Sequence, residues 1–175
     1  MTKIKHRFID HQINPETEIL IVGTFNPDTE KNEAEFFYSR PRNFLWTLIP
    51  AAFGEDSLKG KSKEEKIEFI RQHKIDFIDL ISEVEVDEVT NYKDNYLDKK
   101  VTEWRNVVSE LDKLPNLKKV CFTRKSFGDV PNIKVRIDKI ESYCEQRNIS
   151  FQFLITPSKF YSQNKQIEWS NFFKS

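Results

Sequence analysis

The segment from Gly23 to Trp46 holds the side chains of this sequence that are best suited to chemistry. It follows a short apolar run, Ile19–Val22, and carries amide, aromatic and guanidinium groups, namely Asn26, Phe37, Tyr38, Arg40, Arg42 and Asn43. A connection after a buried strand often carries function, because the scaffold beneath it is rigid. We therefore predict that this segment lines a binding or catalytic site.

A second loop has a related composition. Residues Thr156–Asn164 read TPSKFYSQN and follow another apolar run, Phe151–Ile155. In an open parallel sheet, ligands bind in the crevice beyond the carboxyl ends of the strands, and both loops begin at such an end. The two loops are therefore predicted to meet at one site. The pattern gives the location of this site and not its chemistry.

The elements that position these loops follow from hydrophobic spacing. Four apolar runs are too short for typical helices and are predicted to be strands: Ile19–Val22, Ile75–Ile81, Lys119–Phe122 and Phe151–Ile155. Helical patterns lie between or after them, at Asn43–Phe53, from a capping-box Ser62, at Val101–Leu114, at Val130–Cys144 and at Gln166–Phe173. This alternation indicates a three-layer α/β/α fold around a central four-stranded, mainly parallel sheet. The length of 175 residues fits one domain over residues 1–175.

Composition argues against several classes of protein. The chain has no run of about 18 apolar residues that would predict a transmembrane helix. The segment MTKIKHRFID lacks the apolar core of a secretory signal. Cys121 and Cys144 have no CxxC spacing, the three histidines show no metal-site spacing with them, and no Gly-rich phosphate-binding motif is present. We expect a cytoplasmic protein that needs no metal or cofactor.

Charges are balanced in number but segregated along the chain. There are 28 basic and 28 acidic residues, yet Lys113–Phe127 has five basic and no acidic residues, and Asp76–Asp98 has eight acidic residues and one lysine. Zero net charge argues mildly against a general nucleic-acid binder, which usually carries a basic balance. Solvated faces explain the segregation equally well.

Two motifs occur in order at the strand ends. Asn26–Pro27 follows the first strand, Tyr38 lies eleven residues after Pro27, and PRNFLW ends at Trp46. Thr156–Pro157–Ser158 follows the last strand, and a final helix carries Trp169. This order resembles the uracil-DNA glycosylase superfamily, closest to its mismatch-specific uracil/thymine and hypoxanthine-type members. The expected fold is then uracil-DNA glycosylase-like.

The resemblance implies a monofunctional DNA glycosylase. Such an enzyme hydrolyses the N-glycosidic bond of a deaminated or mismatched base, here of the uracil or hypoxanthine class. It flips the base out of the stack into a pocket, where an aromatic ring stacks on it and a positioned water attacks. The implied protein is a nucleoid-associated monomer that acts on DNA carrying such a base, with no membrane partner and no cofactor.

The resemblance also assigns roles to residues of both loops. Asn26 would orient the water through its carbonyl oxygen, and Asn43 is the second catalytic candidate. The base would be bound by Gly23, Thr24, Phe25, Phe37 and Tyr38, with Tyr38 as the stacking ring. DNA would be contacted by Arg40, Arg42, Thr156, Pro157, Ser158, Lys159, Phe160 and Tyr161, of which the last two could wedge into the gap left by the flipped base.

Structural roles remain open for some of these residues. Asn43 could cap the helix that follows it, since Asn suits that position. Phe37 and Tyr38 could belong to the core, and Asp79, at a strand end, is expected to be a buried, hydrogen-bonded turn residue.

The chain also departs from the motif pattern. The interval from Gly23 to Asn26 is one residue longer than in relatives, Asp28 stands where glycine is frequent, and Thr156 stands where many members have histidine. The alternative function is therefore a catalytically inactive protein of the same fold that binds nucleic acid, a nucleobase or a protein partner. The acidic segment Asp76–Asp98 would favour a basic protein partner.

Overall fold

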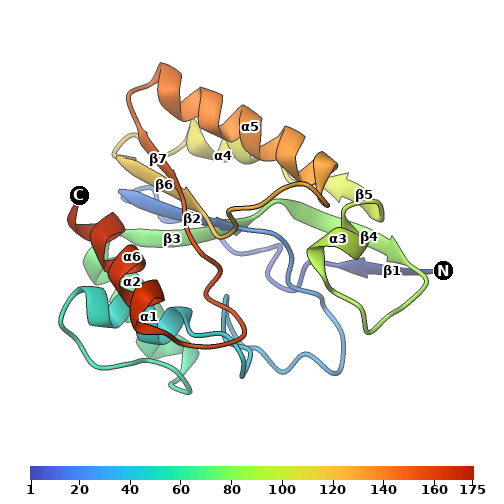
Figure 1. Ribbon diagram of the computed structural model, residues 1–175, viewed down its shortest axis with the longest axis horizontal. Coiled ribbons are helices and arrows are strands. Elements are labelled where there is room, and N and C mark those ends of the chain that lie inside the picture. Colours follow the sequence, from blue (N-terminus) through green and yellow to red (C-terminus); the bar gives the residue numbers. More distant parts are fainter.

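The computed structural model describes residues 1–175, which fold into helices on both sides of a sheet (Figure 1). In chain order the elements are β1 (Thr2–Lys5), β2 (Ile19–Gly23), α1 (Leu45–Ala52), α2 (Lys63–His73), β3 (Ile75–Asp79), β4 (Ile81–Val86), α3 (Asp94–Leu97), β5 (Val101–Trp104), α4 (Val107–Leu111), β6 (Lys119–Phe122), α5 (Pro131–Gln146), β7 (Ser150–Phe153) and α6 (Gln163–Lys174). None of these helices combines the length and the apolar character that crossing a membrane requires.

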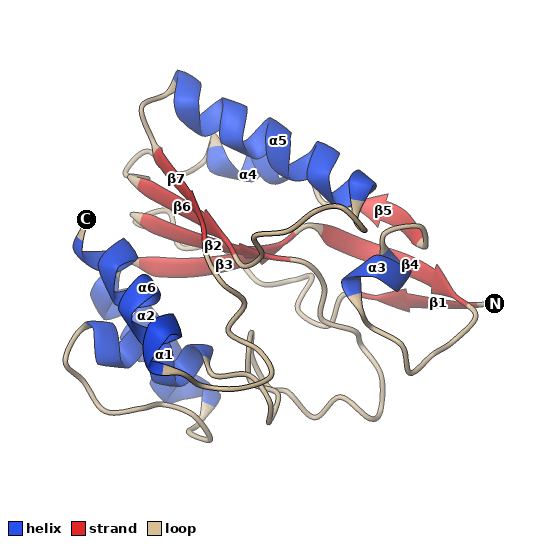
Figure 2. Ribbon diagram, in the orientation of Figure 1, coloured by secondary structure: helices blue, strands red, loops and turns tan.

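Four strands form the central sheet, in the order β3-β2-β6-β7. All neighbours run parallel, and β2 pairs with β3 from Ile19 opposite Ile75 to Gly23 opposite Asp79. Helices α4 and α5 lie on one face of this sheet, and α1, α2 and α6 lie on the other (Figure 2). The predicted three-layer fold with a four-stranded sheet is therefore confirmed, and the sheet is parallel throughout.

Strand β2 is buried on both faces. Its side chains alternate between the two helical layers, as side chains of a strand must. Leu20 and Val22 pack in the core that includes Ile137 of α5, whereas Ile21 packs in a second core that includes Trp46 of α1. Because both faces are covered, the strand reads as a continuous apolar run, and it gives a rigid base to the loop that begins after Gly23.

A second, antiparallel sheet was not predicted. It has the order β1-β4-β5, and β1 pairs with β4 from Thr2 opposite Val86 to Lys5 opposite Glu83. The apolar run Ile75–Ile81 is thus not one strand, because β3 ends at Asp79 and the chain passes through Leu80 into β4. The N-terminal strand places the residues that follow it beside the loops of the central sheet.

The helix predicted over Val101–Leu114 is wrong in its first half. Val101–Trp104 forms the edge strand β5, which pairs with β4, and α4 spans only Val107–Leu111. The apolar residues match helical spacing, but valine, threonine and tryptophan also suit a half-buried strand, and pairing with β4 decides the outcome.

Candidate active site

A cavity of about 600 Å³ opens at the carboxyl ends of β2, β3 and β6. This volume lies within the range of small-molecule sites, about 300–1,000 Å³. The predicted residues that line it are Gly23, Thr24, Phe25, Asn26, Phe37, Tyr38, Arg40, Arg42, Asn43, Thr156, Pro157 and Ser158. Lys159, Phe160 and Tyr161 lie outside the lining, whereas Pro41, Asp79, Tyr92, Asp94 and Thr123 complete it.

The two predicted loops are joined by backbone hydrogen bonds. The Phe44 N–H donates to the Pro157 carbonyl at 2.9 Å, and the Lys159 N–H donates to the Arg42 carbonyl at 2.8 Å. These two bonds form an isolated antiparallel bridge in which Asn43 faces Ser158. Loops that are more than 110 residues apart in the sequence therefore form one wall of the cavity.

Two lysines, one buried and one partly buried, donate hydrogen bonds to backbone carbonyls of this wall. The Lys165 ammonium, 1% exposed, donates to the carbonyls of Ser158 at 2.8 Å and Phe160 at 2.9 Å. The Lys59 ammonium donates to the carbonyls of Pro41 at 2.6 Å and Asn43 at 2.9 Å. Burial lowers the pKa of both lysines. Both ammonium groups bind carbonyls of the two loops and neither lysine lines the cavity, so they position the wall.

The Asn26 amide is fixed by a neighbour that was not predicted, Asn32. Asn32 is 4% exposed, its Nδ2 donates to the Pro27 carbonyl at 2.8 Å, and its Oδ1 accepts from the Ala34 N–H at 3.1 Å. These two backbone contacts set the orientation of the Asn32 amide. The atom of Asn26 that Asn32 Nδ2 meets at 2.6 Å must then be the acceptor Oδ1. One lone pair of the Asn26 oxygen and its whole Nδ2 group remain free.

Asn43 contacts the start of α1 and also lines the cavity. Its Oδ1 accepts from the Leu45 N–H at 3.0 Å, at the start of α1. The helix begins at Leu45, one residue later than the capping interpretation required. The Nδ2 group of Asn43 makes no hydrogen bond within the protein, and the residue lines the cavity. A catalytic role for Asn43 therefore stays a prediction, limited to its N–H donors.

Tyr38 and Gly23 form the floor of the cavity. Tyr38 has a left-handed backbone, with φ of 57°, which non-glycine residues adopt rarely. Its hydroxyl is buried without a hydrogen-bond partner. Burial, together with the nearby Asp79 carboxylate, raises the pKa of this hydroxyl well above its usual value. By contrast, Phe37 is 3% exposed and stacks on Phe77 with 5.6 Å between ring centroids, so most of its ring belongs to the core.

A His6–Asp79 pair borders the same floor. Asp79 is buried as expected, at 8% exposure, but its partner comes from the N-terminal segment, which carried no sequence signal for this contact. His6 Nε2 lies 2.6 Å from Asp79 Oδ2, and His6 Nδ1 accepts from the Phe8 N–H at 3.0 Å. Since Nδ1 accepts, the proton sits on Nε2, and the neutral imidazole donates to the carboxylate.

A curated relative and a solved structure each match 93% of this chain. No family model matches. A hypoxanthine DNA glycosylase from Methanosarcina acetivorans is 24% identical over 169 residues, which are 93% of this chain and 94% of that protein. A solution NMR structure from the same organism, of a protein provisionally named uracil DNA glycosylase, has a TM-score of 0.65 at 20% identity. That likeness covers 93% of this chain and 92% of the other, and it shows that the fold is shared.

A second relative decides the family. A hypoxanthine DNA glycosylase from Methanosarcina barkeri is 32% identical over 120 residues, which are 67% of this chain and 70% of that protein. The chain belongs to the uracil-DNA glycosylase superfamily. The resemblance inferred from the two loop motifs is confirmed, and with it the assignment of the chain as a DNA glycosylase.

The rim of the glycosylase cavity carries unpaired cations. Arg40 and Arg42 are exposed and form no ion pair with an acidic residue, and the same holds for Lys159 beside the cavity. Phe160 and Tyr161 follow Lys159 and are 55% and 41% exposed. The Tyr161 hydroxyl donates to Gln166 Oε1 at 3.1 Å, and the Lys165 ammonium lies 4.0 Å from the centroid of the Phe160 ring. Roles in DNA contact stay predictions for all five residues.

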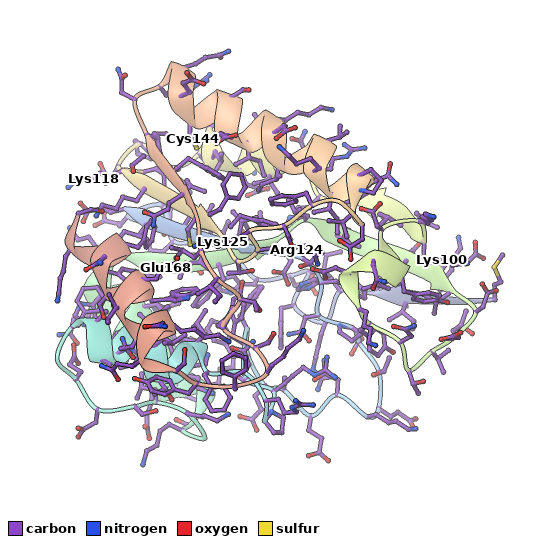
Figure 3. The ribbon with its side chains drawn as sticks, viewed as in Figure 1. Lys100, Lys118, Arg124, Lys125, Cys144 and Glu168 are labelled. Carbon is purple, nitrogen blue, oxygen red and sulfur yellow. The ribbon has the colours of Figure 1, made fainter.

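Asp94 is a second carboxylate of the glycosylase cavity that was not predicted. Its Oδ2 accepts from Thr24 Oγ1 at 3.4 Å and from Arg124 at 3.1 Å, and Arg124 follows β6 (Figure 3). Its Oδ1 has no hydrogen-bond partner in the protein and is not sealed from solvent. Burial raises the pKa of Asp94 more than Arg124 and Thr24 lower it.

This raised pKa predicts the sign of a pH effect on stability. A carboxyl whose pKa is higher in the folded state contributes stability at low pH that is lost as the pH rises through the folded pKa. Asp94→Asn cannot ionise, so the melting temperature of this variant relative to wild type should rise from about pH 3 to pH 7. Thermal unfolding across this range measures the difference. Asp129→Asn, which removes the other carboxylate bound to Arg124, is the control for loss of an ion pair. A difference that falls with pH would contradict the prediction.

Proposed function

We propose that this DNA glycosylase removes a deaminated base, with hypoxanthine as the first candidate and uracil as the second. The relatives from both Methanosarcina species are named hypoxanthine DNA glycosylases. The observation that carries the proposal is the cavity of about 600 Å³ in which both loop motifs meet. It offers room for a base flipped out of the duplex and supplies a ring, amides and carboxylates around it.

Base binding would use the floor of the cavity. Tyr38, held in its left-handed conformation, presents a ring on which a base can stack. Deamination turns N1 of adenine or N3 of cytosine from an acceptor into an N–H donor. The free Asp94 Oδ1 could accept from that N–H, and it would repel the lone pair of the undamaged base. A carboxylate at this place therefore favours deaminated bases.

Bond cleavage leaves negative charge on the departing base and positive character on the sugar. Asn26 would hold the attacking water through the lone pair of Oδ1 that Asn32 does not occupy. Free N–H groups of Asn26 and Asn43 would donate to the base oxygen as charge develops on it. Both amides are held by hydrogen bonds before the substrate arrives, so they need little reorganisation.

DNA binding would place the phosphates against the rim. Arg40, Arg42 and Lys159 are free to contact phosphate oxygens, which positions the duplex without reading its sequence. Phe160 would enter the gap that the flipped nucleotide leaves. The acidic segment Asp76–Asp98 does not form one surface for a basic protein partner, because Asp76, Asp79 and Asp98 are buried and hydrogen-bonded.

A strand-scission assay tests the function directly. Short labelled DNAs would carry hypoxanthine, uracil or xanthine, single-stranded or opposite each normal base, and alkali would cleave the abasic sites formed. We expect scission that is greatest with hypoxanthine and absent with undamaged DNA. Asn43→Ala should lower the rate, because it removes a donor from the cavity wall. Duplex binding without scission on any substrate would instead support the non-catalytic alternative.

A further inference from the structure

Hydrolysis by this site needs a group that takes a proton. An attacking water must lose a proton as its oxygen bonds to the sugar, and an amide such as Asn26 cannot accept it at ordinary pH. The cavity contains only two carboxylates, Asp79 and Asp94. Arg124 and Thr24 hold Oδ2 of Asp94, and its free Oδ1 is the acceptor proposed above for the N–H of the base. Asp79 forms no ion pair with a lysine or arginine, and its side-chain partner is His6, whose Nδ1 accepts from the Phe8 N–H.

Asp79 lines the cavity beside Gly23. It ends β3 directly opposite Gly23, the last residue of β2. Its Oδ1 comes within 2.4 Å of the point where a side chain at Gly23 would begin. This oxygen makes no hydrogen bond in the protein and is not sealed from solvent, whereas Oδ2 is bound by His6. One oxygen is therefore held and the other is open toward the cavity.

His6 connects this carboxylate to the Asn26 turn. The His6 backbone forms a bridge with Pro27, and the Arg7 N–H donates to the Asn26 carbonyl at 2.8 Å. The His6 side chain meanwhile reaches Asp79. The N-terminal segment thus fixes the backbone of the Asn26 turn with its own backbone and the carboxylate with its imidazole.

We propose that Asp79 is the general base of this glycosylase and that His6 is its positioning residue, an inference that rests on the proposed function. The water oxygen forms a bond to C1′ while the C1′–N bond breaks, and that electron pair leaves with the base. The water proton passes to Asp79 Oδ1. It then moves to the departed base or to solvent, which restores the carboxylate.

The same strand supplies a matched control. Asp76 also pairs with a histidine, because its Oδ1 lies 2.7 Å from His11 Nε2, and it is 2% exposed. Asp76 is not part of the cavity lining. It further accepts from the Asn14 N–H at 2.9 Å, so its two oxygens both serve the fold. Each pair joins an aspartate oxygen to a histidine Nε2, and only Asp79 lines the cavity.

The test compares single-turnover rates and melting temperatures of Asp79→Asn and Asp76→Asn. Asp79→Asn keeps an acceptor for His6, so it should stay folded while its rate drops by about 10²–10⁴-fold. It should also lose the acid-side fall of rate that a carboxylate base causes. Asp76→Asn should melt at a lower temperature and keep both the rate and the pH profile below that temperature.

Other outcomes overturn the proposal. A wild-type rate in Asp79→Asn, or an equal loss in both variants, would show that Asp79 is only structural. If the single-turnover rate of Asp79→Asn fell by the same factor at every pH and kept the acid-side fall, Asp79 would instead stabilise the charge on the sugar. Wild-type protein that cleaves none of the damaged bases would overturn the proposed function and this inference together.

His6 gives a second, independent variant. His6→Gln can still donate to Asp79, and we expect a reduced rate with the acid-side fall retained. His11→Gln, the matched change at the other pair, should leave the rate unchanged. If His6→Gln is as active as wild type, the positioning role is wrong, and this holds even if Asp79→Asn fails to fold.

Discussion

Replacing Asn26 by alanine should lower the single-turnover rate of base excision by about 10²–10³-fold, the usual effect of removing one preorganised polar group from an active site. The amide is held by Asn32 at 2.6 Å and is 7% exposed, so its geometry is set before the substrate binds. Alanine cannot hold the water or donate to the base oxygen. The rate would be measured on hypoxanthine and uracil substrates under enzyme excess.

Stability and pH dependence separate this loss from other causes. Asn26→Ala gives up one hydrogen bond to Asn32, which costs about 1 kcal/mol, so the protein should remain folded. Its pH–rate profile should keep the wild-type shape, because the proposed base, Asp79, is untouched. Asn32→Ala leaves the Asn26 amide in place without its anchor, and a smaller loss is expected. A rate for Asn26→Ala within a few-fold of wild type would show that another group of the cavity orients the water.

The parts of the fold that could be predicted depend on local patterns. The strand Lys119–Phe122 was predicted at its observed bounds, and Ile19–Val22 within one residue, because strands buried on both faces read as short apolar runs. The meeting of the two loops followed from the common direction of parallel strands. Motif resemblance then added residue identities at the carboxyl ends.

Contacts between residues far apart in the sequence could not be predicted from local patterns. His6 and Asp79 are 73 residues apart, and they meet only because β1 pairs with β4 and leads the chain back across the cavity. Asp94 lay within an acidic segment whose members look alike in the sequence, although some are buried and some solvated. Asn32 lay inside the predicted segment, but its role depends on the conformation of the turn around Pro27, which composition does not specify.

The left-handed backbone conformation of Tyr38 could not be predicted from the sequence either. A tyrosine is not expected at positive φ, since its Cβ makes this region unfavourable. The motif spacing indicated a base-stacking ring and gave no indication of a strained backbone. Packing explains how the conformation persists, because the Tyr38 ring contacts Phe77, with centroids 5.4 Å apart, and its hydroxyl lies against Gly23. The floor of the cavity is therefore determined by several elements at once.

Gly23→Ala should be the most damaging single change to this floor. A Cβ at this position would lie 2.4 Å from Asp79 Oδ1 and 2.5 Å from the Tyr38 hydroxyl oxygen. Neither neighbour can yield freely, because His6 holds the carboxylate and the backbone of Tyr38 fixes its ring. Overpacking of this kind costs about 1–3 kcal/mol of unfolding free energy. The displaced carboxylate and ring should also reduce base excision by more than tenfold, about 1.4 kcal/mol in activation free energy.

Gly128→Ala is the control for this prediction. Gly128 lies outside the cavity, a Cβ there meets no atom within 4 Å, and its backbone has no positive φ. We expect its unfolding free energy to change by no more than about 0.5 kcal/mol and its excision rate to stay at the wild-type value. Denaturant unfolding and the scission assay would be run on both variants. If Gly23→Ala kept both its stability and its rate, the close approach of Asp79 and Tyr38 to β2 would not be a requirement of the site. If it lost stability alone, the floor would be structural, and the catalytic assignment of Asp79 would lose its geometric support.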